Sequence, residues 1–218
     1  MVRPRVIETD EGIQGEFEVQ IYDQMQRRFR DRGWIETNAI IKSGIGSGCI
    51  LEIGPGPGYL GLEWLKKTQG TTLKGLDISP DMIAVAQQNA SEYGLSDRVE
   101  YVQSSGEKMS FEDDMFDAVI SNGSLHEWQE PDKTIDEIWR VLKPQGKVFI
   151  SDLRRDIRPC LKWFMWLMTK PREIRPGFLT SVAAAYIPHE IEKMMKSTRF
   201  EEFEVKSNLM GIQMIAKK

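Results

Sequence analysis

The sequence predicts an α/β fold: a three-layer, doubly wound, mostly parallel sheet of seven strands with a reversed strand in a carboxy-terminal hairpin. Three observations predict this fold. Short apolar runs alternate with amphipathic helical segments between residues 48 and 152. A loop with Gly54, Gly56 and Gly58 at alternate positions follows the first apolar run. Two short apolar segments meet around Ser207 and Asn208, which indicates an antiparallel hairpin at the sheet edge.

The amino-terminal region is expected to form a helical cover. Residues 1–11 are charged and without periodicity, so we expect a loose arm there. Apolar residues then recur at every fourth position from Ile13 to Phe29, which predicts an amphipathic helix that ends at Gly33. This helix either covers the core only or also closes over a ligand. Tyr22 lies off the apolar stripe and is a candidate to hydrogen-bond a ligand carboxylate. A second short helix is expected at residues 35–42.

The central region predicts five strands joined by helices. The strands are residues 49–53, 72–77, 99–102, 116–121 and 147–152, and the helices follow from about residues 60, 80 and 131. Ser79 and Pro80 suit the N-cap and first position of the second of these helices. Strands with helical crossovers form a parallel sheet, and ligands bind at the carboxyl ends of its strands. These ends carry five polar residues: Glu52, Asp77, Ser105, Asn122 and Asp152.

The glycine loop favours a cationic ligand over a dinucleotide. Residues 56–61 also fit the dinucleotide pattern G-x-G-x-x-G. Pro55 and Pro57 remove two backbone donors that a pyrophosphate needs, however, and Glu52 adds a carboxylate at the loop's entrance. S-adenosylmethionine (SAM), with its sulfonium and ammonium groups, suits such a loop better. A turn that binds nothing is the alternative.

Asp77 ends the second strand about 20 residues after the glycine loop. A carboxylate at this point can accept hydrogen bonds from both hydroxyls of a ribose. The alternative is an ordinary acid at a strand end that caps the next helix.

Composition narrows the classes of partner. The chain has 29 basic and 33 acidic residues in 218, and this balance argues against a nucleic-acid substrate. Two cysteines, Cys49 and Cys160, give no disulfide framework, so we expect a reducing, cytoplasmic location. Two histidines and two cysteines, none at ligand spacing, lead us to expect no metal site. No secretory signal is evident, and the most apolar run, residues 163–168, is too short to span a bilayer.

Residues 153–187 interrupt the alternation of strands and helices. Arginines and aromatic residues are interleaved there, which is typical both of a lid or substrate wall and of a dimer interface. We therefore consider both a lid and a homodimer that forms through it. The candidate substrate-binding residues are Trp128, Arg154 and Tyr186.

Four segments, residues 51–58, 75–82, 116–122 and 140–146, carry a family resemblance. In this order and spacing, the chain resembles the SAM-dependent methyltransferases of the Rossmann-like class, most closely the ubiquinone/menaquinone C-methyltransferases. The resemblance covers residues 48–150. It implies a single domain, 1–218, with a helical cover (1–47), a SAM-binding core (48–152), a lid insertion (153–187) and a carboxy-terminal helix and hairpin (188–218).

The resemblance also implies roles for individual residues. The methionine part of SAM would be held by Glu52, Gly54, Gly56 and Gly58. Asp77 would bind the ribose, and Ile78 and Met82 would flank the adenine. The segment Ser105, Gly106 and Glu107 lies where the family commonly has an acid for the adenine amino group, and Ser105 at that place is a departure. Asn122 would lie beside the methyl group.

His126 is the one histidine near the predicted methyl group, and it is a candidate general base with Glu127 beside it. The alternative is a histidine that only fixes the loop by hydrogen bonds. The function that follows is a SAM-dependent methyltransferase that methylates a small-molecule acceptor and releases S-adenosylhomocysteine. The alternatives are a dinucleotide-dependent oxidoreductase and a module that holds SAM without turnover. The residues leave the acceptor and the methylated atom open.

Overall fold

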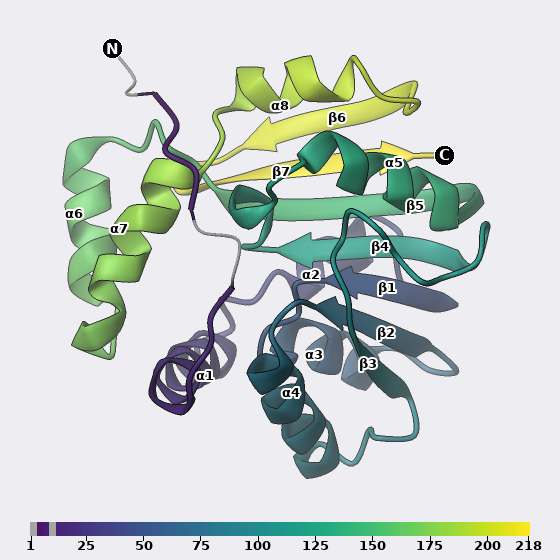
Figure 1. The fold of residues 1–218 in the computed structure, drawn as a ribbon, viewed down its shortest axis with the longest axis horizontal. Helices are drawn as coiled ribbons and strands as arrows, with labels where there is room; N and C mark the ends of the chain where they lie inside the picture. The colour runs from purple at the N-terminus through teal and green to yellow at the C-terminus, as the bar shows by residue number, and fades with distance from the viewer. Residues whose placement is uncertain (1–3, 9–11) are drawn as a thin grey trace.

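The computed structural model describes residues 4–8 and 12–218, and it confirms the predicted three-layer α/β fold (Figure 1). The described residues form one seven-stranded sheet with the order β3-β2-β1-β4-β5-β7-β6. Strands β1 to β5 pair in parallel, and β7 is reversed because it runs antiparallel to both β5 and β6. The strands are β1 (Cys49–Ile53), β2 (Thr72–Asp77), β3 (Val99–Gln103), β4 (Phe116–Asn122), β5 (Leu142–Leu153), β6 (Glu202–Ser207) and β7 (Gly211–Lys217).

Helices cover both faces of the sheet. Successive residues of a strand point to opposite faces, so Leu51 packs in one core with Ile135, and Ile50 packs in the other with Trp64 and Ala86. The first core includes α5 and α8, and the second includes α2, α3 and α4. The helices are α1 (Glu16–Asp31), α2 (Thr37–Lys42), α3 (Tyr59–Lys67), α4 (Pro80–Glu92), α5 (Pro131–Val141), α6 (Pro159–Met168), α7 (Arg175–Ala184) and α8 (Pro188–Met195).

Local chemistry starts α4 as the sequence predicts. Pro80 is its first residue, and the Ser79 hydroxyl accepts a hydrogen bond of 3.2 Å from the backbone N–H of Met82. This cap fixes where α4 begins relative to Asp77, the last residue of β2.

Strand β5 begins earlier than expected. The sequence predicts a helix over 131–142, a turn at 143–146 and a strand from Lys147, whereas α5 ends at Val141 and β5 starts at Leu142. Phe116 pairs with Leu142 and Ala118 with Lys147, so residues 143–146 bulge out of an otherwise continuous ladder. The expected turn is wrong: residues 143–146 form a bulge within β5, because the buried Leu142 already pairs with β4 before them.

The expected loose arm is wrong for residues 4–8. The Arg5 guanidinium donates to the His126 carbonyl oxygen at 2.8 Å, and the Val6 backbone N–H donates to the Ala183 carbonyl oxygen at 3.1 Å. Arg5 also lies 4.3 Å from the centre of the Tyr186 ring. The composition of this segment does not indicate these contacts, because the residues that it contacts lie far away in sequence. Residues 1–3 and 9–11 of the predicted arm lie outside the described residues.

The 153–187 insertion forms α6, a 3-10 helix (Arg172–Ile174) and α7, which lie beside α1 at the carboxyl ends of the parallel strands (Figure 1). Helix α6 has no buried residue, whereas α7 buries Val182 and Ala184. Within residues 4–8 and 12–218, no helix is long and apolar enough to cross a membrane.

Candidate active site

A cavity of about 500 Å³ opens at the carboxyl ends of β1, β2 and β4. The strand order reverses between β1 and β4, and open α/β sheets bind ligands at such a point. Its volume falls in the range of small-molecule sites. The lining residues come from α1 and the segment before it, from the ends of β1 and β2, from the loops after β3 and β4, and from the first turns of α4 and α5.

The glycine loop forms one wall of this cavity. Gly54, Gly56 and Gly58 have φ angles of 65°, 52° and 85°, a region that side chains rarely adopt. A β-carbon on Gly54 would lie 2.6 Å from the Ser124 β-carbon, so the close approach also requires glycine. Gly54 and Gly56 line the cavity, whereas Gly58 does not and instead forms the cap at the start of α3.

Asp77 lies at the end of β2 and faces the cavity. Its Oδ1 accepts the backbone N–H of Ser79 at 2.9 Å, and its Oδ2 accepts that of Gly56 at 3.1 Å. Burial raises the pKa of Asp77, and the backbone hydrogen bonds oppose that rise. Each carboxylate oxygen keeps a further lone pair, so Asp77 is placed to accept ligand hydroxyls.

Glu52 does not supply the charge that the sequence argument placed at the loop's entrance. Its side chain extends from β1 to Gly61 of α3, and only 2% of the residue is exposed. Burial raises the pKa of Glu52 to about 8, although the Gly61 backbone N–H donates to the carboxyl group. Its Oε2 has no hydrogen-bond partner among the described residues, and Glu52 does not line the cavity. The acid therefore contacts α3 rather than the cavity.

The residues expected around the adenine lie together on the cavity wall. Ile78 and Met82 line it from the end of β2 and the start of α4. Ser105, Gly106 and Glu107 line it from the loop after β3. Ile78 is 38% exposed, which is unusual for an isoleucine. A flat apolar ligand in the cavity would cover this side chain.

Helix α1 also closes over the cavity, because Tyr22 lines it. The Tyr22 hydroxyl accepts a hydrogen bond of 3.0 Å from the Gln26 amide, and burial raises the pKa of Tyr22. On the opposite side, Trp128 lines the cavity, and its indole N–H donates to the Ser124 hydroxyl at 3.2 Å. These two aromatic rings come from segments far apart in sequence.

Besides Glu52, Gly58 and His126, the predicted site residues Asn122, Arg154 and Tyr186 do not line the cavity. The Asn122 amide oxygen accepts a hydrogen bond of 2.8 Å from the Ser151 hydroxyl. Arg154 forms an ion pair of 2.6 Å with Asp156, so its charge is already compensated. Tyr186 is 8% exposed and lies beneath the amino-terminal segment. Their predicted ligand contacts remain predictions.

His126 is buried at the end of the loop after β4, and it does not line the cavity. Its Nδ1 lies 2.8 Å from the Asp152 Oδ1, and the His126 backbone N–H donates to the Asp152 Oδ2 at 2.8 Å. Burial alone would lower the pKa of His126, but the charge of Asp152 raises it to about 9. An imidazole that holds its proton at neutral pH cannot accept another, so this environment disfavours the predicted general base.

Sequence reasoning missed most of the loop after β4. Gly123, Ser124 and Glu127 line the cavity, and Ser124 shares a hydrogen bond of 2.7 Å with Ser121. The position of this loop directly after β4 was a signal that could have identified it. No comparable signal marked Gly12 or Ile13, which line the cavity from the segment before α1.

The cavity wall is acidic. Among the described lining residues there are four carboxyl side chains and no lysine, arginine or histidine. The four are Asp77, Glu107, Glu127 and Glu130. Such a wall attracts a cation and repels a pyrophosphate, and together with the apolar Ile78 and Met82 it fits a cationic nucleoside such as SAM.

Comparison with known proteins supports the same class. The profile of the methyltransferase domain family matches residues 51–150. An uncharacterized methyltransferase of Bacillus subtilis is 35% identical over 102 residues, 47% of this chain and 54% of that protein. The demethylmenaquinone methyltransferase of Bacteroides fragilis is 27% identical over 165 residues, 74% of this chain and 65% of that protein. The chain thus spans less than two thirds of the length of these curated relatives.

Solved structures share the fold. A SAM-dependent methyltransferase from Aquifex aeolicus superposes with a TM-score of 0.66 at 21% identity, and the match covers 84% of this chain and 89% of that one. Phosphoethanolamine N-methyltransferase 2 of Haemonchus contortus, in complex with S-adenosylhomocysteine, gives a TM-score of 0.61 at 25% identity over 78% of this chain and 38% of that one. In fold, and in the profile match over residues 51–150, the chain is similar to the class I, Rossmann-like SAM-dependent methyltransferases, and among the curated relatives it resembles the ubiquinone/menaquinone C-methyltransferases.

Proposed function

We propose that this chain binds SAM in the cavity at the carboxyl ends of β1, β2 and β4 and transfers the methyl group to a small-molecule acceptor. The observation that carries this proposal is the acidic wall, with four carboxyl side chains and no basic one among the described lining residues. A sulfonium cation gains from such a wall, whereas the pyrophosphate of a dinucleotide would be repelled. The family profile over residues 51–150 supports the same reading.

SAM supplies a methyl group that its sulfonium already activates, so the protein must mainly bind, orient and exclude water. Asp77 is placed to hold the ribose hydroxyls, and Ile78 and Met82 to flank the adenine. Gly54 and Gly56 let the backbone approach the ligand. The walls on both sides of the cavity limit the access of water.

The acceptor that we propose is a small molecule with an apolar body. Trp128 presents an aromatic ring to the cavity, and its indole N–H is already bonded to Ser124. Its free surface is therefore apolar. Demethylmenaquinone methyltransferases are among the relatives of this chain. This similarity also favours an acceptor with an apolar body.

The test is methyl transfer from labelled SAM. Purified protein is incubated with methyl-labelled SAM and a small-molecule fraction of cell extract, and the label is followed by chromatography. We expect label in a low-mass product and equimolar S-adenosylhomocysteine. Binding of SAM without transfer would favour a module that only holds SAM, and binding of NAD in its place would favour an oxidoreductase. Either result contradicts the proposal.

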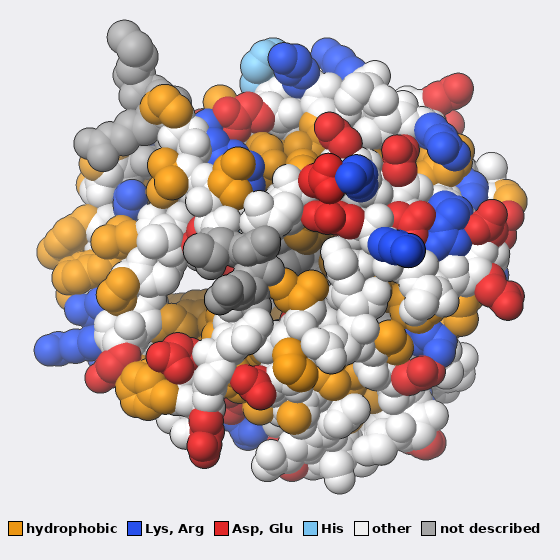
Figure 2. All heavy atoms as spheres, in the orientation of Figure 1, with side chains coloured by type: hydrophobic (Ala, Val, Ile, Leu, Met, Phe, Trp, Pro, Cys, Tyr) orange, Lys and Arg blue, Asp and Glu red, His pale blue; other side chains and the backbone are white. Residues whose placement is uncertain are grey.

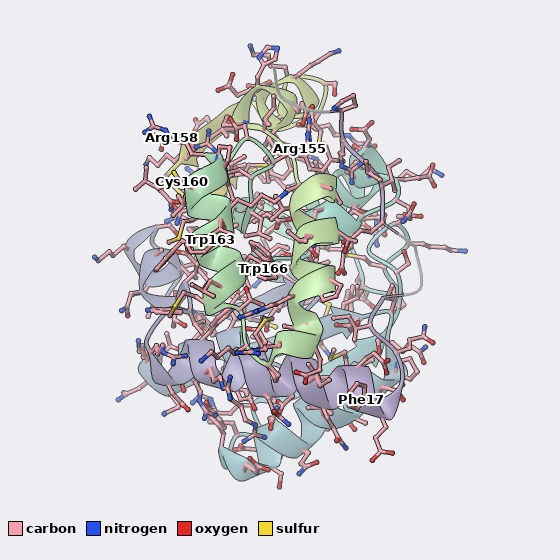
Figure 3. The ribbon with its side chains drawn as sticks, turned by 90° about the vertical axis from the view of Figure 1, so that its left-hand side faces the viewer. Phe17, Arg155, Arg158, Cys160, Trp163 and Trp166 are labelled. Atoms are coloured by element: carbon pink, nitrogen blue, oxygen red, sulfur yellow. The ribbon has the colours of Figure 1, made fainter. Side chains whose placement is uncertain are left out.

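The outer face of α6 supports a homodimer. Four apolar side chains of this helix, Trp163, Phe164, Leu167 and Met168, are between 41% and 61% exposed. Hydrophobic side chains gather at the side of the molecule where α6 and α7 lie (Figure 2). Trp166 instead faces α7, where the Arg175 guanidinium lies 4.4 Å from its ring centre (Figure 3). We propose that a second copy of the chain covers the outer face of α6.

Analytical ultracentrifugation tests the homodimer. The wild type should sediment as a dimer at micromolar concentration, and Trp163→Glu should sediment as a monomer. Trp34→Glu changes another tryptophan that is 54% exposed and lies outside α6, so it should remain a dimer. A monomeric wild type would contradict the proposal.

We also propose that the protein works in a reducing, cytoplasmic compartment. Cys49 is half-buried, Cys160 is exposed, and both are free. The exposed thiol of Cys160, which lies within the insertion in α6, would be oxidised outside such a compartment. Fractionation of cells that express the chain, with thiol labelling of Cys160, tests this proposal, and a periplasmic or extracellular location would contradict it.

A further inference from the structure

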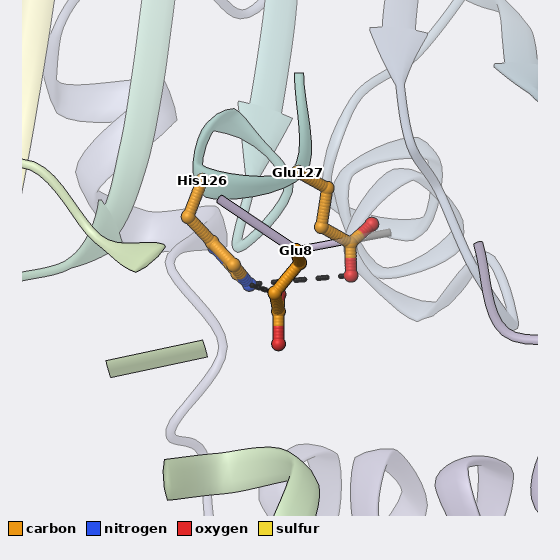
Figure 4. A group of neighbouring side chains, drawn as sticks. All are labelled: Glu8, His126 and Glu127. Carbon is orange, nitrogen blue, oxygen red and sulfur yellow. Dashed lines mark ion pairs between the residues drawn. The ribbon is translucent and has the colours of Figure 1, made fainter. Parts of the chain in front are cut away.

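Three side chains meet where the amino-terminal segment passes the loop after β4. The His126 Nε2 lies 3.4 Å from the Glu8 Oε2 and 4.0 Å from the Glu127 Oε1 (Figure 4). One ligand atom from each of the three residues lies within 4.8 Å of the others. We refer to Glu8, His126 and Glu127 as the Glu–His–Glu cluster.

The imidazole of this cluster is held in a fixed orientation. Asp152 accepts from the His126 backbone N–H at 2.8 Å and contacts the ring Nδ1 at 2.8 Å. Because Asp152 holds Nδ1, Nε2 points toward Glu8 and Glu127, and an ion bound there would take the place of the Nε2 proton. Among the described residues, Nε2 forms ion-pair contacts with these two carboxylates and makes no hydrogen bond. Metal-binding histidines commonly have such a carboxylate behind the second ring nitrogen.

Glu8 is also fixed. Its Oε1 lies 3.4 Å from the Ser181 hydroxyl, which leaves Oε2 toward the His126 ring. The neighbouring Arg5 and Val6 anchor the segment to carbonyl oxygens of His126 and Ala183. Two distant parts of the chain, the amino-terminal segment and the loop after β4, therefore bring the three ligand atoms together.

The charge of the cluster favours a cation. Glu8, Glu127 and Asp152 supply three carboxyl groups around a single imidazole, and His126 and Asp152 are 4% and 8% exposed. Arg5 is the nearby base, but it donates to backbone carbonyl oxygens and to none of these carboxylates. The proton on His126 compensates part of this negative charge, and a divalent ion in its place would compensate more of it.

We propose that Glu8, His126 and Glu127 bind a divalent first-row transition-metal ion, with Asp152 as the positioning residue of His126. An imidazole with two carboxylates suits Mn²⁺, Fe²⁺, Co²⁺ or Zn²⁺, whereas Mg²⁺ and Ca²⁺ prefer oxygen ligands alone. Ligand atoms about 2.0–2.2 Å from an ion lie roughly 3 Å apart, so the observed 3.4 and 4.0 Å need only small movements. Three protein ligands leave at least one position for water or another oxygen.

The metal site would lie next to the proposed active site, because Glu127 belongs to both the cluster and the cavity wall. An ion at this place would bind an oxygen of the acceptor, an extension that rests on the proposed function. The metal site itself does not. Sequence reasoning predicted no metal site because it considered only histidine and cysteine spacing, and Glu8 lies too far away in sequence to be noticed.

The experiment uses the full chain after treatment with a chelator. Cobalt chloride is titrated while the visible d–d absorption is recorded, and zinc chloride is titrated in a calorimeter. We expect one ion per chain, with affinity at least tenfold lower in His126→Gln, Glu8→Gln and Glu127→Gln. Asp152→Asn should lower the affinity about 10- to 100-fold through the orientation of His126. His189→Gln is the matched control, because His189 is exposed and outside the cluster.

Several results would overturn the proposal: no stoichiometric ion in the wild type, equal loss in His189→Gln, or full affinity in Glu8→Gln. Because a variant can fail to fold, the nitrogen NMR shift of His126 Nε2 on zinc addition is measured in the wild type. A large shift supports the site, and an unchanged resonance contradicts it. SAM binding, measured by calorimetry in the same sample, distinguishes failure of the metal site from failure of the proposed function.

Discussion

The Oδ2 atom of Asp77 lies 3.1 Å from the backbone nitrogen of Gly56, so the end of β2 is hydrogen-bonded to the glycine loop after β1. Asp77 also accepts the Ser79 backbone N–H at the start of α4. One carboxylate thus joins three segments of the cavity wall. A ligand that contacts Asp77 contacts a group whose position is already fixed.

Asp77→Ala should weaken the free energy of SAM binding by about 1–3 kcal/mol, because it removes a charged acceptor for the ribose hydroxyls. Calorimetry measures this change. Asp97→Ala removes an exposed aspartate away from the cavity and should bind SAM like the wild type. Equal affinity in the two variants, both folded, would remove the ribose role from Asp77.

Tyr22→Phe should weaken SAM binding by about 1 kcal/mol, because the hydroxyl in the cavity is lost while the ring remains. Tyr93→Phe is the matched control, since the Tyr93 hydroxyl donates to Glu63 at 2.8 Å outside the cavity. Isothermal titration with SAM compares the two. If both variants bind SAM as tightly as the wild type, the Tyr22 hydroxyl does not contact SAM, and α1 only covers the cavity.

Gly54→Ala should lower the free energy of unfolding more than Gly94→Ala. Both glycines have a φ of 65°, so alanine costs about 1 kcal/mol of backbone strain at each. At Gly94 nothing lies within 4 Å of the added carbon, whereas at Gly54 the Ser124 β-carbon lies 2.6 Å away. We expect a further loss of about 1–3 kcal/mol at Gly54. Urea denaturation measures both, and equal losses would show that the loop has room for a side chain.

The stability of the protein should depend on pH through Glu52. The folded chain raises the pKa of Glu52 from 4.5 to about 8 through burial. Between these values the folded state binds a proton that the unfolded state has released, so stability falls as pH rises, by about 1.4 kcal/mol per pH unit. Glu52→Gln keeps the shape and removes this proton.

Urea denaturation at pH 5.5 and pH 7.5 isolates the effect. The wild type should lose roughly 2 kcal/mol more than Glu52→Gln between these pH values, since all other groups titrate in both proteins. The same loss in both would mean that Glu52 stays ionised in the folded chain.

Local patterns predicted the sheet and part of the site. Gly54 and Asp77 could be found because a glycine loop and an acid at the next strand end are sequence-local features. The N-cap at Ser79 is another, and it was confirmed. Each of these residues acts at the end of its own strand or helix, so neighbouring residues contain the information.

The remaining parts of the site depend on tertiary contacts. The ion pair of Arg154 with Asp156, for example, does not follow from a sequence pattern that marks Arg154 as a candidate substrate ligand. The sequence suggests a charge of Glu52 at the loop's entrance because it does not show that α3 covers this side chain. The position of Glu8 beside His126 follows from hydrogen bonds of Arg5 and Val6 to distant carbonyl oxygens. No spacing pattern encodes contacts of this kind.

Calorimetric titration of the pure, folded protein with SAM and with S-adenosylhomocysteine tests the central claim most directly. The account predicts that one molecule of either ligand binds per chain, that binding weakens in Asp77→Ala, and that NAD gives no heat. Absence of heat with both SAM and S-adenosylhomocysteine, or tighter binding of NAD, would contradict it.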